Sequence, residues 1–289
     1  MIKRLLIFFI LVSLFIDSFG QIKKRKEFKI YDALLFKNKP NLSVHGLSDI
    51  IMIYDDSILD KHSRHPTNLN ARVFNKGRLD RFLDKYKPAK KVPICFDIES
   101  WWLMPPYLQA SIKKYVEVLS YFKKRNKNNP VGLYGVLPYA DAYINEHLRG
   151  NKNKNWLSEW ELINNSLEEI VEHSDISFPS CYTRTKDINI WKKSVDMQIE
   201  KIKKYGKKIP IYAFIWPQYY AAGFSYNNDF IDSTMWREQL EYLYKKCDGI
   251  VIWGPPFNLA TRAPINWDDK AGWWLETKKF IEKYNIRSN

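Results

Sequence analysis

The chain has 289 residues, a formal net charge of +14 and three cysteines. This length fits one α/β barrel without a second domain. The cysteines, Cys95, Cys181 and Cys247, are odd in number and lie in apolar segments, which argues against a disulfide framework. The five histidines are scattered, and no CxxC or HExxH spacing occurs, so we expect neither a metal site nor a cofactor.

Residues 1–20 have the pattern of an export signal. The basic pair Lys3 and Arg4 precedes an apolar run that is too short to span a bilayer comfortably, and small residues precede the end of the segment at Gly20. We expect cleavage there, which leaves one domain over 21–289, exported to the periplasm, the cell surface or the medium, with no stable membrane insertion. A retained N-terminal anchor is the alternative.

The mature chain would still carry a charge of +13. One interpretation is a polyanionic substrate attracted over long range. The other is a compositional bias that places lysines on solvated helix faces, as at Lys192 and Lys193. No nucleic-acid-binding module is recognisable, so we expect no nucleic-acid partner. The aromatic content of 16% mildly favours a carbohydrate ligand.

Short β-branched and aromatic segments recur along the chain with charged, helix-like segments between them. The expected strands are Phe28–Phe36, Asp49–Asp55, Val92–Glu99, Val131–Pro138, Ile176–Tyr182, Ile209–Trp216 and Gly249–Gly254. The expected helices are Leu108–Lys124, Trp156–His173, Ile188–Tyr205 and Thr234–Lys246.

This alternation predicts an α/β fold, a TIM-like (β/α) barrel of seven or eight strands in a single domain. Several strands are apolar on successive residues, as in a parallel sheet that is covered on both faces. A doubly wound open sheet is the competing fold, but the glycine-rich first turn typical of that fold does not occur.

Carboxylates and aromatic residues concentrate where the expected strands end, which is where a barrel builds its active site. The sharpest signal is Asp97-x-Glu99, because residues two apart on a strand point to the same side. Two carboxylates so close cannot both ionise easily at neutral pH, so one can serve as a general acid.

The spacing is too tight for an acid and a nucleophile on opposite sides of a scissile bond. It suits substrate-assisted hydrolysis, in which a 2-acetamido group of the sugar is the nucleophile. Alternatively, the Asp caps a helix or pairs with a lysine.

Five segments resemble strands of the hyaluronidase family, in the same order along the chain. They are residues 51–55 (IMIYD), 94–101 (ICFDIESW), 132–138 (GLYGVLP), 179–182 (PSCY) and 249–254 (GIVIWG). The resemblance implies a (β/α)-barrel glycoside hydrolase in which Glu99 is the general acid/base and Asp97 orients the acetamido group.

The resemblance also implies substrate-binding roles for residues at the neighbouring strand ends. Tyr182 would hydrogen-bond in the same subsite, Trp253 would form its wall, and Tyr54 and Asp55 would line the adjoining cleft. Trp216 is a further aromatic residue at the end of an expected strand. Ordinary core packing of the aromatic residues, and helix capping by Asp55, are the alternatives.

The chain also departs from the family pattern. Arg-Pro does not follow the Glu-x-Trp of residues 99–101, the family's disulfides cannot form, and Cys-Tyr-Asn is missing from the loop after the fourth strand. Tyr139 and Tyr143 both remain candidates for the tyrosine of that loop.

We therefore expect an exported hydrolase that cleaves N-acetylhexosamine linkages in a glycosaminoglycan-like polysaccharide, which could be anionic. Two alternatives stay open. One is a barrel glycosidase that uses a distant carboxylate such as Asp55 on a non-acetamido sugar. The other is a non-catalytic barrel that binds glycans.

Overall fold

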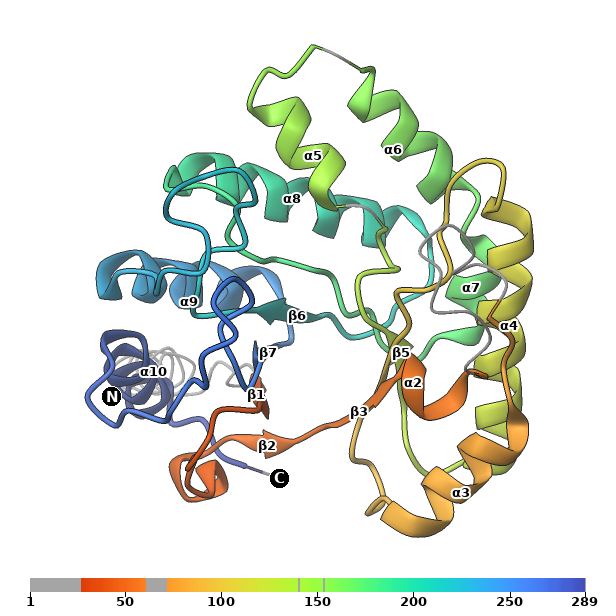
Figure 1. The fold of residues 1–289 in the computed structure, drawn as a ribbon, viewed down its shortest axis with the longest axis horizontal. Coiled ribbons are helices and arrows are strands. Elements are labelled where there is room, and N and C mark those ends of the chain that lie inside the picture. The colour runs from red at the N-terminus through yellow and green to blue at the C-terminus, as the bar shows by residue number, and fades with distance from the viewer. Residues whose placement is uncertain (1–26, 61–71, 140, 153, 289) are drawn as a thin grey trace, which may run out of the picture.

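The computed structural model describes residues 27–60, 72–139, 141–152 and 154–288 (Figure 1). The expected signal segment, 1–20, lies outside the described residues. In the described part, no helix is both long and apolar enough to cross a membrane.

The strands form two parallel sheets. The first has the order β2 (Ser48–Asp49), β1 (Lys29–Leu34), β7 (Gly249–Gly254), β6 (Tyr212–Ile215). The second has the order β3 (Ile51–Tyr54), β4 (Ile94–Asp97), β5 (Val131–Leu133). All the pairings between these strands are parallel, as expected for alternating βα units.

Two connections join the sheets. Only Ile50 separates β2 from β3, so one stretch of chain passes from the first sheet to the second. On the other side, the segment expected as strand Ile176–Tyr182 makes isolated parallel bridges, with Tyr134 beyond β5 and with Ile211 and Phe214 at β6. The described residues thus form an α/β fold with two parallel sheets, and not the single continuous sheet that was expected.

Helices lie around the outside of the strands (Figure 1). They are η1 (Leu42–His45), α2 (Asp55–Ile58), α3 (Lys76–Tyr86), α4 (Leu108–Arg125), α5 (Asp141–Leu148), α6 (Trp156–Asn165), α7 (Glu168–His173), α8 (Ile188–Lys204), α9 (Ser233–Lys246) and α10 (Gly272–Tyr284).

Two further expected elements differ from the structure. The single helix expected over 156–173 is two helices, and at the break the Ser166 hydroxyl donates to the Leu162 carbonyl, an alternative to continuing the helical ladder. Asp55 does not end a strand but begins α2, where it and Asp56 place two carboxylates in the first turn. Negative charge is favourable at that end of a helix.

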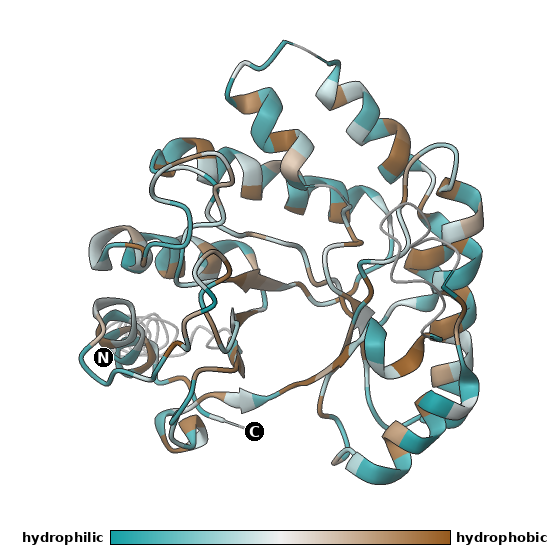
Figure 2. Ribbon diagram, viewed as in Figure 1, coloured by the Kyte–Doolittle hydropathy of each residue, from teal (hydrophilic) through white to brown (hydrophobic). Residues whose placement is uncertain are grey.

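The core has three apolar clusters that follow the alternation of side chains along the strands. In β7, Val251 packs in the cluster between the sheets, whereas Ile250 and Ile252 pack outward in a cluster that includes α8, α9 and α10 residues. A third cluster joins the second sheet to α3, α4 and α7. Figure 2 shows apolar residues concentrated on the strands, with polar and apolar residues alternating around the helices.

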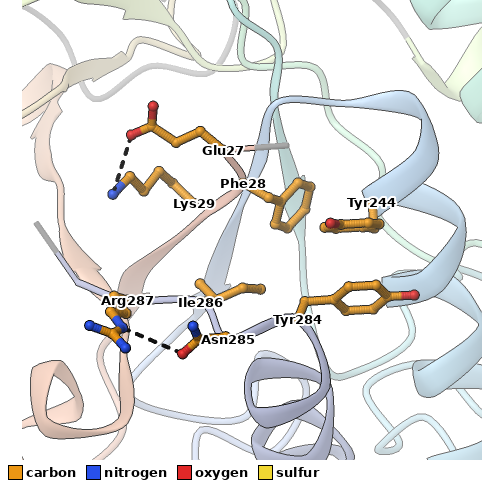
Figure 3. A pocket seen from close by; sticks show the side chains of 8 residues that line it. All are labelled: Glu27, Phe28, Lys29, Tyr244, Tyr284, Asn285, Ile286 and Arg287. Atoms are coloured by element: carbon orange, nitrogen blue, oxygen red, sulfur yellow. Dashed lines mark hydrogen bonds and ion pairs between the residues drawn. The ribbon is translucent and has the colours of Figure 1, made fainter. Parts of the chain in front are cut away.

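Aromatic packing fills the end of the molecule where β1 begins. Phe28 lies 5.1 Å from Tyr244, and Tyr244 stacks on Tyr284 at 3.9 Å between ring centroids (Figure 3). The surface pocket beside these rings has a volume of only about 250 Å³. The larger cavity described below lies at the opposite, carboxyl-terminal ends of the strands.

Gly132 in β5 tests the contact between β5 and the 176–182 segment. A Cβ at this position would lie 2.3 Å from the Ile176 carbonyl oxygen, so the backbone would have to move apart. We expect Gly132→Ala to lower the free energy of unfolding by about 1–3 kcal/mol, as overpacking does in other cores. Urea denaturation followed by circular dichroism measures this change.

The matched control is Gly77→Ala in α3, where the added Cβ would meet no atom closer than 3.5 Å. Its stability should stay unchanged or rise slightly, because alanine is the better helix former. Equal effects of the two substitutions would contradict the close approach at β5.

Candidate active site

A cavity of about 630 Å³ opens at the carboxyl-terminal ends of the strands. This is the edge at which barrel enzymes build their sites. The structure brings together every candidate from the sequence except Asp55. The lining includes Tyr54, Asp97, Glu99, Tyr139, Tyr143, Tyr182, Trp216 and Trp253.

The two candidate catalytic carboxylates come from one short stretch of backbone. Asp97 is the last residue of β4, and Glu99 follows two residues later, so both line the cavity. The Ile98 side chain between them packs in the apolar cluster on the helix side. The Tyr115 hydroxyl of α4 donates to the Ile98 carbonyl at 2.7 Å and fixes this backbone.

Burial and mutual repulsion hold protons on this pair. Burial, followed by the charges of Glu99 and Asp55, raises the pKa of Asp97 to about 8. Burial and the charge of Asp55 also raise the pKa of Glu99. Within the described residues, Asp97 Oδ1 is buried without a hydrogen-bond partner, so it can accept a hydrogen bond from a bound molecule. The pair can therefore hold a proton at neutral pH and act as an acid.

Asp55 does not line the cavity with the two candidate carboxylates. Its Oδ2 accepts a 2.5 Å hydrogen bond from Ser100 Oγ and lies 3.3 Å from Nη1 of Arg72. The same arginine binds the exposed Asp56 at 2.8 Å and donates to Ser100 Oγ at 3.1 Å. Asp55 can thus act on the catalytic pair through its charge, and it holds Ser100, the residue next to Glu99.

Aromatic rings form one wall of the cavity. Tyr182 stacks on Trp253 with ring centroids 5.8 Å apart and an interplanar angle of 27°. Trp216 lies edge-on to Trp253 at 5.2 Å, and Tyr220 lies edge-on to Tyr182 at 5.9 Å. Burial, the neighbouring Tyr134 and the carboxylates of Asp97 and Glu99 all raise the pKa of Tyr182, so its hydroxyl stays protonated.

Both tyrosines of the loop after the fourth expected strand line the cavity, but their surroundings differ. Burial raises the pKa of Tyr139, and the charge of Glu99 contributes to this rise. Burial and Glu159 raise the pKa of Tyr143, whose ring packs edge-on against Trp156 at 5.1 Å. Tyr139 is thus the tyrosine that is electrostatically coupled to Glu99.

Sequence reasoning missed several polar lining residues, among them Tyr134, Asp141, Arg184 and Tyr220. Tyr134 stands inside the GLYG stretch and could have been selected from it. Arg184 follows Tyr182 by two residues, but nothing local in the sequence pairs it with Asp141. The described residues contain no group of three or more histidine, cysteine, aspartate or glutamate side chains placed to hold a metal ion.

No known protein-family model matches this sequence, and no curated protein matches it significantly. Solved structures are similar in fold. Bee venom hyaluronidase aligns with a TM-score of 0.57 and 15% identity, over 90% of this chain and 98% of that chain. The bee venom enzyme in complex with a hyaluronic acid tetramer aligns with a TM-score of 0.56 and 14% identity, over 90% and 97%.

The catalytic domain of a beta-amylase from Paenibacillus polymyxa aligns with a TM-score of 0.45 and 8% identity, over 91% of this chain and 99% of that chain. The likeness to the bee venom enzyme establishes the fold. The chain has a glycosidase-like α/β fold that is highly divergent in sequence.

Neutralising Asp97 should stabilise the protein. The folded-state pKa of about 8 exceeds the ordinary value of 3.8. Above about pH 4 the unfolded chain therefore ionises this group more readily than the folded chain does. The resulting penalty on folding is absent below that pH. It grows by about 1.4 kcal/mol for each pH unit up to about pH 8.

We therefore expect Asp97→Asn to raise Tm by several degrees at pH 7.5 and by little at pH 4, as measured by differential scanning calorimetry. Asp229→Asn, at an exposed carboxylate for comparison, should leave Tm nearly unchanged at both pH values. A lower Tm for Asp97→Asn at pH 7.5 would contradict the unfavourable burial.

Removing the charge of Asp55 should lower the pKa of both catalytic carboxylates, because that charge raises each of them. In Asp55→Asn, Glu99 would lose its proton at lower pH, and the alkaline limb of the pH–rate profile would move to lower pH. Asp56→Asn is the matched control, because Asp56 binds the same arginine but is exposed to solvent. Identical shifts in the two variants would show that Asp55 has no special influence.

Proposed function

We propose that this chain is a hyaluronidase-like glycoside hydrolase that cleaves N-acetylhexosamine linkages in a polysaccharide by a substrate-assisted, retaining mechanism. The observation that carries the proposal is the placement of Asp97 and Glu99 side by side in one aromatic cavity, both with raised pKa. The fold shared with bee venom hyaluronidase supports it.

In the first step, Glu99 gives its proton to the glycosidic oxygen as the bond from that oxygen to the anomeric carbon breaks. The carbonyl oxygen of the substrate's acetamido group attacks the same carbon and forms a cyclic oxazolinium ion. Asp97 accepts a hydrogen bond from the acetamido N–H and stabilises the positive charge that develops. Its unpartnered Oδ1 supports this role.

In the second step, water attacks the anomeric carbon from the face that the leaving group vacated. The Glu99 carboxylate takes a proton from this water, the oxazolinium ring opens, and the product keeps the starting configuration. An N–H donor from the substrate favours the ionised form of Asp97 and so lowers its pKa. The proton that the pair holds is then available on Glu99, where the first step needs it.

The aromatic wall supports a sugar at this position. Apolar faces of sugar rings pack on indole and phenol rings, and Tyr182 with Trp253 presents such a surface beside the carboxylates. A second carboxylate mechanism on a non-acetamido sugar has less support, because Asp55 is held by Arg72 and Ser100 outside the cavity lining.

The proposal includes two features beyond the site. We take the two sheets as parts of one seven-segment (β/α) barrel, which the direct passage from β2 to β3 and the bridges of residues 176–182 support. We also take the protein as exported, which the pattern of residues 1–20 supports.

Glu99→Gln should abolish turnover and leave glycan binding intact. Glutamine keeps the volume and a hydrogen-bonding oxygen but has no proton to give, and general acid catalysis typically contributes about 10²- to 10⁴-fold. Initial rates on N-acetylhexosamine polymers, with binding measured by calorimetry, test this expectation.

Glu117→Gln, at a half-exposed glutamate paired with Lys76 in the helix layer, is the matched control and should keep full activity. Glycan binding without turnover in the unmodified protein would favour the non-catalytic alternative. Full activity of Glu99→Gln would refute the mechanism.

A further inference from the structure

The cavity carries negative charge, although the chain as a whole is basic. Apart from tyrosines, the ionisable side chains among the described lining residues are three carboxylates and one guanidinium. They are Asp97, Glu99, Asp141 and Arg184. With one proton shared by Asp97 and Glu99, two negative charges still face the single positive charge.

That cation is already bound. Arg184 Nε donates to Asp141 Oδ2 at 2.7 Å, and its Nη2 donates to Oδ1 of the same carboxylate at 3.1 Å. The guanidinium carbon also lies 4.6 Å from the centre of the Tyr220 ring. Both partners of the ion pair are largely buried, with exposed side-chain fractions of 18% and 12%. A bidentate ion pair of this kind has a fixed geometry, and its guanidinium has little attraction left for another anion.

The neighbouring Arg149 does not supply a free cation in place of Arg184. Arg149 donates to the Arg184 carbonyl and lies 3.1 Å from the Glu146 carboxylate, and it does not line the cavity. Some basic side chains of the helix layer are held in ion pairs, as in Lys201 with Glu161 and Lys246 with Asp196. The net charge of +14 therefore gives the cavity no free cation among its described lining residues.

We infer that the cavity selects an uncharged polysaccharide, in which the units next to the cleaved N-acetylhexosamine carry no carboxylate. This inference rests on the proposed function. In a glycosaminoglycan such as hyaluronan, a uronate stands on each side of every N-acetylhexosamine. Its carboxylate would meet like charges and no free cation among the described lining residues, in a site where burial strengthens repulsion.

The test compares three polymers of matched length with the unmodified protein. They are native hyaluronan, hyaluronan whose carboxylates have been reduced to primary alcohols, and a β-linked oligomer of N-acetylglucosamine. The first two differ only at the carboxylate group, which loses its charge on reduction, so their ratio reports mainly the electrostatic contribution. We expect kcat/KM to be at least about tenfold higher on the reduced polymer than on native hyaluronan, and the neutral oligomer to be cleaved.

Asp141→Asn then tests the source of the discrimination. Loss of the carboxylate frees the Arg184 guanidinium, so the advantage of the reduced polymer should shrink severalfold. Asp84→Asn removes one negative charge elsewhere, at an exposed carboxylate of α3 that pairs with Arg125 of α4. It should leave the ratio unchanged. Tm of each variant shows that it is folded.

Each result bears on a distinct claim. Native hyaluronan cleaved as fast as its reduced form would overturn the inference and leave the proposed function standing. An unchanged ratio in folded Asp141→Asn would overturn the assignment of selectivity to the Arg184–Asp141 pair. If no polymer were cleaved, or if Glu99→Gln cleaved them all, the proposed function would fail and this inference with it.

Discussion

The free-energy cost of burying Asp97 and Glu99 together is the constraint on which the rest of the site depends. Carboxylates removed from water ionise reluctantly, and two neighbours with the same charge ionise more reluctantly still. The pKa of about 8 for Asp97 expresses this cost, which the fold bears near neutral pH. The surrounding sheets and helices must supply the compensating stability, mainly through the three apolar clusters on either side of the strands.

The same burial makes the site chemically useful. A carboxyl group in water would have lost its proton near neutral pH, whereas a buried one can still deliver a proton to a leaving oxygen. The aromatic wall of Tyr182, Trp216 and Trp253 keeps the surroundings apolar and presents ring faces to a ligand. Asp55 adds negative charge behind the pair, while Arg72 and Ser100 hold it in place. The burial of Asp97 thus lowers the stability of the fold and at the same time keeps a proton available in the site.

The sequence predicted the elements whose pattern is local. The bounds of β7 agree with the expected strand, and α8 and α9 agree within one residue at each end. Helix α3 was missed, although Leu79, Phe82, Leu83 and Tyr86 recur in the sequence at helical spacing. The strand-end rule brought the candidate residues to the cavity, but it could not separate Tyr54, which ends β3 and lines the cavity, from Asp55, which begins α2 and does not.

What the sequence could not show is how charge is distributed in space. The bonds between Arg184 and Asp141 span 43 positions in the chain, and only the fold reveals that the cation of the cavity is already neutralised. The formal charge of +14 suggested a polyanionic partner, yet attraction at long range and selection at the site are separate effects. A basic surface can raise the rate of encounter with an anionic polymer, whereas turnover depends on the charges within a few ångströms of the cleaved bond. The described lining residues present carboxylates, which is the reason for proposing a neutral chain as the substrate.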